Sequence, residues 1–137
     1  MKAKIISGIV FLIIILMGIT YYQFNRSHID ISKQEPVYSI SATKLFEQFS
    51  ADEAKANSKY LGKIIEVKGK IYSIEKGVNE DYNILLMDSD EMFGISCNIS
   101  SNEINESIKA GQELSIKGEC SGMLSDVVLI RCIIIKK

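Results

Sequence analysis

The pattern of apolar and polar residues divides the chain into three parts. Residues 5–22, IISGIVFLIIILMGITYY, form one apolar run without a charged residue. Residues 25–40 are mostly polar and follow no hydrophobic period, and they include Pro36, the only proline. From residue 41 onward, apolar residues recur first at helical spacing and then at every second position. The pattern therefore predicts a transmembrane signal-anchor at 1–24, a linker at 25–40 and a folded domain at 41–137.

The apolar run has the length of a membrane-spanning helix, because residues 5–22 at about 1.5 Å per residue extend roughly 27 Å. Lys2 and Lys4 precede it, so the positive-inside rule places the N-terminus in the cytoplasm and the domain outside, in a periplasmic or extracellular location. Two alternatives are a cleaved signal peptide, for which Gly18-Ile-Thr20 is a poor site, and a buried helix of a soluble domain. A lipid anchor would need a cysteine after the run, whereas the first cysteine is Cys97. We expect an uncleaved single-pass anchor.

The domain opens with helical spacing. Leu45, Phe46 and Phe49 form one apolar stripe, which predicts a helix beginning near residue 41. Ser50 and Glu53 have the spacing of a capping box, so a second helical piece is expected to start at Ser50. Gly62 is expected to end that piece in a left-handed conformation.

Period-two alternation then predicts five strands, at residues 63–77, 82–88, 93–99, 113–121 and 126–135. Gly69, inside the long first strand, predicts a bulge or bend. Residues 88–91 form an acidic turn that suits at most weak Ca²⁺ binding. Residues 101–111 have Ile104 and Ile108 four positions apart and predict a short helix. Five strands with a helix between the third and fourth, and a glycine-kinked first strand, are the layout of an OB-fold barrel. The predicted fold is therefore mainly β: a five-stranded OB-fold barrel with an N-terminal helical segment, preceded by one transmembrane helix.

Several short motifs also follow one another in a fixed order between residues 41 and 134. They are Tyr60-Leu-Gly62-Lys63, Val67-Lys-Gly69, Cys97, Gly111-Gln112, Gly118-Glu-Cys120-Ser-Gly122, Asp126-Val127 and Cys132. As an ordered set they resemble the tRNA-anticodon-like (tRNA_anti-like) OB-fold family of bacterial envelope proteins. The resemblance implies a short secreted, lipid-anchored or membrane-anchored protein. It implies nucleic-acid binding by fold analogy alone.

Charge and residue types narrow the function. The chain has 16 basic and 17 acidic residues, and without Lys2 and Lys4 the remainder carries a net charge of about -3. Nucleic-acid binders usually carry a basic excess, so this balance weakens a nucleic-acid function. His28, the only histidine, lies in the predicted linker, so the domain has no histidine-based nucleophile–base pair. We expect no enzyme activity, no catalytic residue, no metal and no small-molecule cofactor.

The cysteines allow three arrangements. A hairpin centred on Asp126 would place Cys120 opposite Cys132, close to the distance of a disulfide in an oxidising compartment. Alternatively all three cysteines are reduced core residues, or Cys97 is one partner of a bridge. Cys97 alternates with Ile95 and Ile99, which indicates a core position.

OB folds bind ligands on their second and third strands and in the neighbouring loops. Single-strand binders place aromatic and basic side chains there. The candidates are Tyr72, Tyr82, Lys70 and Lys76, although the same positions also fit an ordinary solvated surface. The predicted function is a non-catalytic binding or protein-interaction module that is anchored by residues 5–22 and has an envelope protein as its partner. The alternative is binding of single-stranded nucleic acid or oligosaccharide by the OB face.

Overall fold

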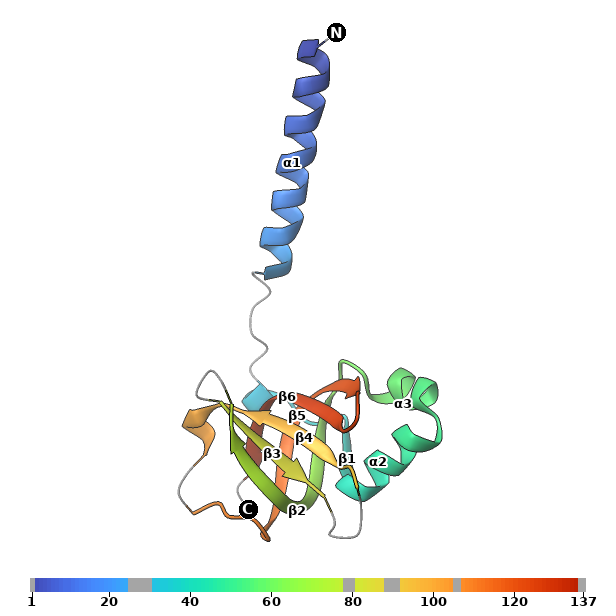
Figure 1. Ribbon diagram of the computed structural model, residues 1–137, viewed down its shortest axis with the longest axis vertical. Helices are drawn as coiled ribbons and strands as arrows, with labels where there is room; N and C mark the ends of the chain where they lie inside the picture. The colour runs from blue at the N-terminus through green and yellow to red at the C-terminus, as the bar shows by residue number, and fades with distance from the viewer. Residues whose placement is uncertain (1, 25–30, 78–80, 88–91, 105–106, 136–137) are drawn as a thin grey trace.

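The computed structural model describes residues 2–24, 31–77, 81–87, 92–104 and 107–135. In Figure 1 the strands curl into a barrel, and two short helices lie beside it. In chain order the elements are α1 (Lys2–Phe24), η1 (Ile31–Lys33), β1 (Tyr38–Ser41), α2 (Ala42–Ala51), α3 (Glu53–Tyr60), β2 (Ile64–Lys76), β3 (Tyr82–Leu86), β4 (Ile95–Ile99), η2 (Ser101–Glu103), β5 (Glu113–Met123) and β6 (Val127–Ile135).

Five of the strands close the barrel. The sheet order is β1-β2-β3-β4-β6-β5, and β5 pairs again with β2. All pairs within the closed barrel are antiparallel except β4 with β6, which is parallel. The mainly β, OB-type barrel predicted from the sequence is therefore present. The strand that the sequence did not predict is β1, which runs parallel to β2 outside the closed barrel.

Strand β2 belongs to both halves of the barrel. Its residues 64–70 pair with β5, and its residues 71–76 pair with β3. The bulge lies between Ile71 and Ser73, so of the two predicted alternatives at Gly69, a bulge or a bend, the bulge is not at this residue. Gly69 instead allows a close approach, because a Cβ there would lie 2.8 Å from Ala42 Cβ and 3.2 Å from Leu86 Cβ. This glycine lets α2 lie directly against the strand.

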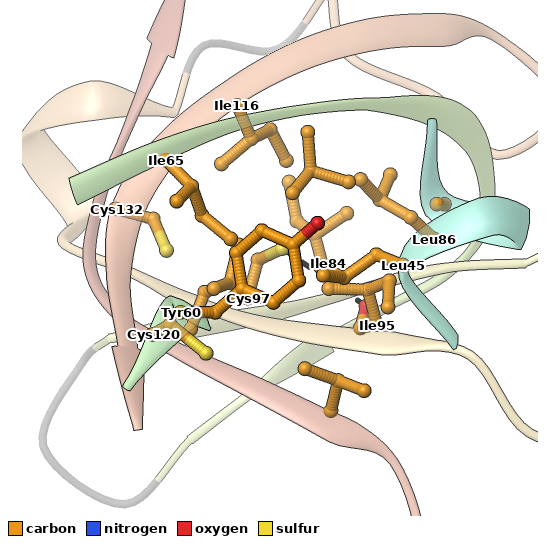
Figure 2. Packing of buried hydrophobic residues seen from close by; sticks show 14 of the residues in the cluster. Leu45, Tyr60, Ile65, Ile84, Leu86, Ile95, Cys97, Ile116, Cys120 and Cys132 are labelled. Carbon is orange, nitrogen blue, oxygen red and sulfur yellow. Dashed lines mark hydrogen bonds between the residues drawn. The ribbon is translucent and has the colours of Figure 1, made fainter. Parts of the chain in front are cut away.

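The hydrophobic core lies inside the barrel and extends under α2. Leu45 and Phe49 of α2 are 0% and 1% exposed, which confirms the predicted apolar stripe. Figure 2 shows Leu45 and Tyr60 among the isoleucines of the strands. The Tyr60 hydroxyl donates to Gln48 Oε1 over 2.8 Å, so the buried ring keeps a polar partner. Burial of these side chains is the main source of stability for a barrel of this size.

The junction between α2 and α3 differs from the predicted capping box. Ser50 lies in the last turn of α2, and the residue that caps α3 is Asp52. The Asp52 carboxylate accepts a hydrogen bond from the Lys55 backbone N–H over 3.0 Å. A carboxylate is favoured at a helix N-terminus by the helix dipole as well as by the hydrogen bond. Gly62 has φ +71°, as predicted for the end of α3.

The predicted helix at 101–111 was also wrong. Among the described residues of this segment, the structure has the 3-10 turn η2, and Ile104 after it is extended, with φ -92° and ψ 133°. Ser100 makes no side-chain cap. Ile104 and Ile108 still pack against the hydrophobic core, so their burial does not require a helix. Residues 105–106, like the acidic turn 88–91, lie outside the described residues.

The predicted linker is shorter than expected, because residues 31–37 lie against the barrel; we call them the strap. Ile31 is 4% exposed, and η1 contacts β6. Lys117 of β5 donates from Nζ to the carbonyl oxygens of Ser32 and Gln34, over 3.2 and 2.8 Å. The Val37 backbone N–H then bonds to the Ile64 carbonyl oxygen over 2.8 Å and leads into β1. Residues 25–30, including His28, lie outside the described residues.

The N-terminal apolar run forms α1. Its described side chains from Phe11 to Met17, and Ile19, are largely exposed. In the part of the chain that the structure describes, no helix is long and apolar enough to cross a membrane. The transmembrane segment therefore stays a prediction.

Candidate ligand-binding face

The outer surface of β3 and β4 is the candidate site. Alternate residues of these strands point into the core, among them Ile84, Leu86, Ile95, Cys97 and Ile99. The intervening residues, Asn83, Leu85, Ser96 and Asn98, therefore point outward. No helix lies in front of β3 and β4 in the view of Figure 1.

The strand register places these outward residues in adjacent pairs. Asn83 lies opposite Asn98, and Leu85 lies opposite Ser96. The Ser96 hydroxyl donates to Asn83 Oδ1 over 2.9 Å, which fixes both side chains. Asn98 is exposed, and the other three are half-buried.

Neighbouring strands extend the surface. Val128 of β6 lies beside Ser96, and Ser73 of β2 lies beside Leu85. Tyr72, at the bulge next to Ser73, is 55% exposed. We call these seven residues the β3–β4 face: Tyr72, Ser73, Asn83, Leu85, Ser96, Asn98 and Val128.

The four residues predicted from the sequence do not form one site. Tyr82 and Lys76 are direct cross-strand partners at one end of the barrel. Tyr82 shares the inward side of β3 with Ile84 and Leu86 and is half-buried, so it lies outside the β3–β4 face. Lys70 is exposed on β2 opposite Glu113 of β5. Only Tyr72 belongs to the face.

Asn83, Ser96 and Asn98 were not among the sequence candidates. The signal that could have identified them is the alternation that marks Ile84 and Cys97 as core residues, because it also defines the opposite face of each strand. The candidates predicted from the sequence are instead aromatic and basic side chains. Phe93, which shares the parity of core residues, is 40% exposed and has its ring 6.4 Å from that of Phe46 in α2.

Lysines gather at α3, away from β3 and β4. Lys59 Nζ lies 5.3 Å from the Tyr38 ring centre and 4.8 Å from that of Tyr60, and Lys63 Nζ lies 5.5 Å from Tyr38. Hydrogen bonding with the Tyr60 side chain raises the pKa of Lys59 above its ordinary value. Lys55 and Lys59 also line a pocket of about 370 Å³ between α2 and α3. The strands β3 and β4 themselves contain no charged residue.

An open groove of about 1020 Å³ is lined by residues that include Gly69, Gln112, Leu114 and Ile134. It also includes Ser107 and Ile108, next to residues that lie outside the described part of the chain. Its shape therefore does not define a site.

The cysteines are all buried and free. Of the three arrangements that the sequence allows, this is the one with three free core cysteines; a Cys120–Cys132 bridge is not formed, because Cys120 lies opposite Leu129. Register shifts at residues 117–119 and 120–122 move the hairpin away from the simple centre at Asp126. Cys132 instead lies opposite Ile99 of β4, and its thiol interacts with that of Cys97. A hydrogen bond with the Cys132 thiol, together with burial, raises the pKa of Cys97 well above its ordinary value. Burial also raises the pKa of Cys120.

Comparison with known proteins agrees with the barrel and its motifs. The family model for tRNA_anti-like proteins matches residues 1–134. The chain belongs to the tRNA_anti-like family. This confirms the resemblance inferred from the ordered motifs.

The fold of this tRNA_anti-like chain is also similar to a solved structure from Klebsiella pneumoniae subsp. pneumoniae, named a "putative nucleic acid-binding lipoprotein". The two have a TM-score of 0.57 and 22% sequence identity, and the match covers 71% of this chain and 91% of the other. No curated protein matches the chain.

Proposed function

We propose that this tRNA_anti-like chain is a non-catalytic binding module of the cell envelope. Its N-terminal helix holds it at the membrane as a single-pass anchor, and the β3–β4 face binds the ligand. Family membership and the fold shared with a lipoprotein support an envelope location. The absence of histidine from residues 29–137 supports a non-catalytic role.

Helix α1 supports the anchor. Its apolar side chains are exposed along the described part of the helix, and a lipid environment would cover them. The chain from Phe24 to Ile31 can extend at most about 25 Å, since each residue spans no more than about 3.6 Å. The barrel would therefore stay close to the membrane surface.

The observation that carries the binding role is the exposed polar surface of β3 and β4. On an OB barrel these strands form the usual ligand surface. In this chain the strap lies over β5 and β6 and α2 lies against β2, whereas the β3–β4 face presents Asn98 and Tyr72 to solvent.

Two experiments test the two parts of the proposal. Alkaline carbonate extraction of membranes should leave the full chain in the pellet and release a variant that lacks residues 1–24. Release of the full chain would contradict the anchor.

For the binding role, the full chain in detergent is tested against single-stranded oligodeoxythymidylate, chitotetraose and maltotetraose. At least one of these probes should bind, and Asn98→Ala should weaken that binding about fivefold or more, the value of one lost hydrogen bond. Lys55→Ala, on α3, is the control and should bind as the unmodified chain does. Binding that depends on Lys55 and not on Asn98 would place the ligand elsewhere.

A second candidate is single-stranded nucleic acid as the ligand of the same face. It is supported by the name of the Klebsiella lipoprotein and by the exposed ring of Tyr72, on which a base could stack. If nucleic acid is the ligand, the chain should bind oligodeoxythymidylate with an affinity that falls steeply as the salt concentration rises, because phosphate contacts release counterions.

A further inference from the structure

The chemistry of the β3–β4 face narrows the class of ligand, on the assumption that the proposed binding role of this face is correct. Every polar side chain that β3 and β4 direct outward is an uncharged amide or hydroxyl group: Asn83, Ser96 and Asn98. Ser73 continues the row on β2. Each of these groups can both donate and accept hydrogen bonds.

The hydrogen bond between Ser96 and Asn83 prepares this surface for a ligand. Because Asn83 Oδ1 accepts from Ser96 Oγ, the Asn83 side-chain amide has a fixed orientation. Its NH₂ group retains two donors, and Asn98 on the facing strand offers a complete amide at an exposed position. Oriented groups of this kind lose little freedom on binding.

The distribution of charge disfavours a polyanion on this face. A single-stranded nucleic acid needs cations along its path, but β3 and β4 have none. On β2, the exposed Glu75 lies opposite Asn83, so the charged residue that continues this row is a carboxylate.

The face also offers an apolar surface of limited size. Leu85 and Val128 lie half-buried beside Ser96, and the Tyr72 ring stands exposed at the bulge next to Ser73. A ring beside amides and hydroxyls suits the C–H surface and hydroxyl groups of a sugar. We propose that the β3–β4 face binds an uncharged, hydroxyl-rich sugar chain, with the Asn83 and Asn98 amides as its hydrogen-bonding groups.

The test is a calorimetric titration of the full chain in detergent with chitotetraose and maltotetraose, both uncharged. At least one should bind in a saturable manner, with the same affinity at about 50 mM and about 500 mM salt, because no ion pair is formed. Asn98→Ala should weaken binding about fivefold or more, and Tyr72→Ala should do the same. Lys55→Ala is the control and should bind unchanged. An unchanged thermal midpoint shows that each variant is folded.

Asn98→Lys distinguishes a sugar from a phosphate polymer. It should weaken sugar binding without creating tight binding of oligodeoxythymidylate. Failure of both sugars, combined with salt-sensitive oligodeoxythymidylate binding that Asn98→Ala removes and Asn98→Lys strengthens, would overturn the sugar inference and leave the proposed binding role intact. If Asn98 affects no probe, both are overturned.

Discussion

The two sides of the barrel are covered very differently. On β5, with the adjoining parts of β2 and β6, the chain covers itself: the strap crosses this side, and Lys117 holds it through two carbonyl oxygens. On β3 and β4 the outward side chains are uncharged and, apart from Leu85, polar; Asn98 is exposed and the others are half-buried. Both sides enclose the same hydrophobic core.

This difference indicates where the barrel is built for stability and where it is available for binding. A lysine that is 8% exposed, with its ammonium group bonded to backbone oxygens, contributes to folding. An exposed asparagine such as Asn98 contributes little to the free energy of folding. The role proposed for it is therefore contact with a ligand. Substitutions should therefore change stability mainly on the covered side and binding mainly on the β3–β4 face.

The largest effect is expected inside the covered side, at Gly118. A Cβ there would lie 2.5 Å from Cys132 Sγ and 3.2 Å from the Ile130 carbonyl oxygen. Gly118→Ala should lower the free energy of unfolding in urea by about 3 kcal/mol, the upper end of the usual cost of overpacking. In a double-mutant cycle, Cys132→Ala should recover part of this loss. Purely additive effects would show that the sulfur is not the obstacle.

Lys117→Met should cost about 1.5–3 kcal/mol, because it removes both charge-assisted hydrogen bonds to the strap but keeps the apolar stem. Amide hydrogen exchange of residues 31–41 should accelerate at the same time. Lys70→Met, at an exposed position of β2, is the matched control and should change stability by less than about 0.5 kcal/mol. Equal losses in the two variants would remove the distinction between a covered and an open side.

Alkaline pH should destabilise the protein through Cys97. Its pKa in the folded state lies well above its ordinary value of 9.0, so the unfolded chain loses this proton first. The contribution of this pKa difference to the free energy of unfolding is complete below pH 9.0. Above pH 9.0 it is lost as the pH rises, by at most about 1.4 kcal/mol per pH unit. Urea unfolding at pH 7 to 10, expressed relative to Cys97→Ala, measures it. A parallel pH dependence in the variant would argue against a role for Cys97.

The smallest effect on stability is expected on the β3–β4 face. Ser96→Ala removes the hydrogen bond to Asn83 and should cost about 0.5–1.5 kcal/mol, less than Lys117→Met. Chemical denaturation of both variants under the same conditions tests the order. If Ser96→Ala proves the more damaging, the polar pairs of this face are structural, and their proposed use in binding weakens.

Much of the fold could be predicted because it depends on local patterns. Alternation identified the closed barrel strands, and the stripe of Leu45 and Phe49 identified α2. Predictions that depended on which of several neighbouring groups makes a given contact were less successful. Ser50 has the correct spacing for a cap, but the Asp52 carboxylate takes that role. Ile104 and Ile108 do pack against the core, but Ile104 is extended, so their spacing did not identify a helix.

The sequence predicted the candidate site only in part, because the direction in which a strand residue points depends on the alignment of the whole strand. Tyr72 was predicted, but Tyr82 has the inward parity of β3, which the sequence showed only once the strand was aligned with its core residues. A bridge between Cys120 and Cys132, one of the three arrangements that the sequence allowed, is not formed, because the hairpin register cannot be counted from its turn when bulges intervene.

The sequence by itself determined the apolar N-terminal run, the family and the alternating strands, because composition and periodicity report directly on which residues avoid water. Only the tertiary structure decided that Cys97 neighbours Cys132, that Lys117 holds the strap, and that Asn83, Ser96 and Asn98 share one open face. These contacts join residues that are distant along the chain, and strand register and bulges set them, so no local pattern records them.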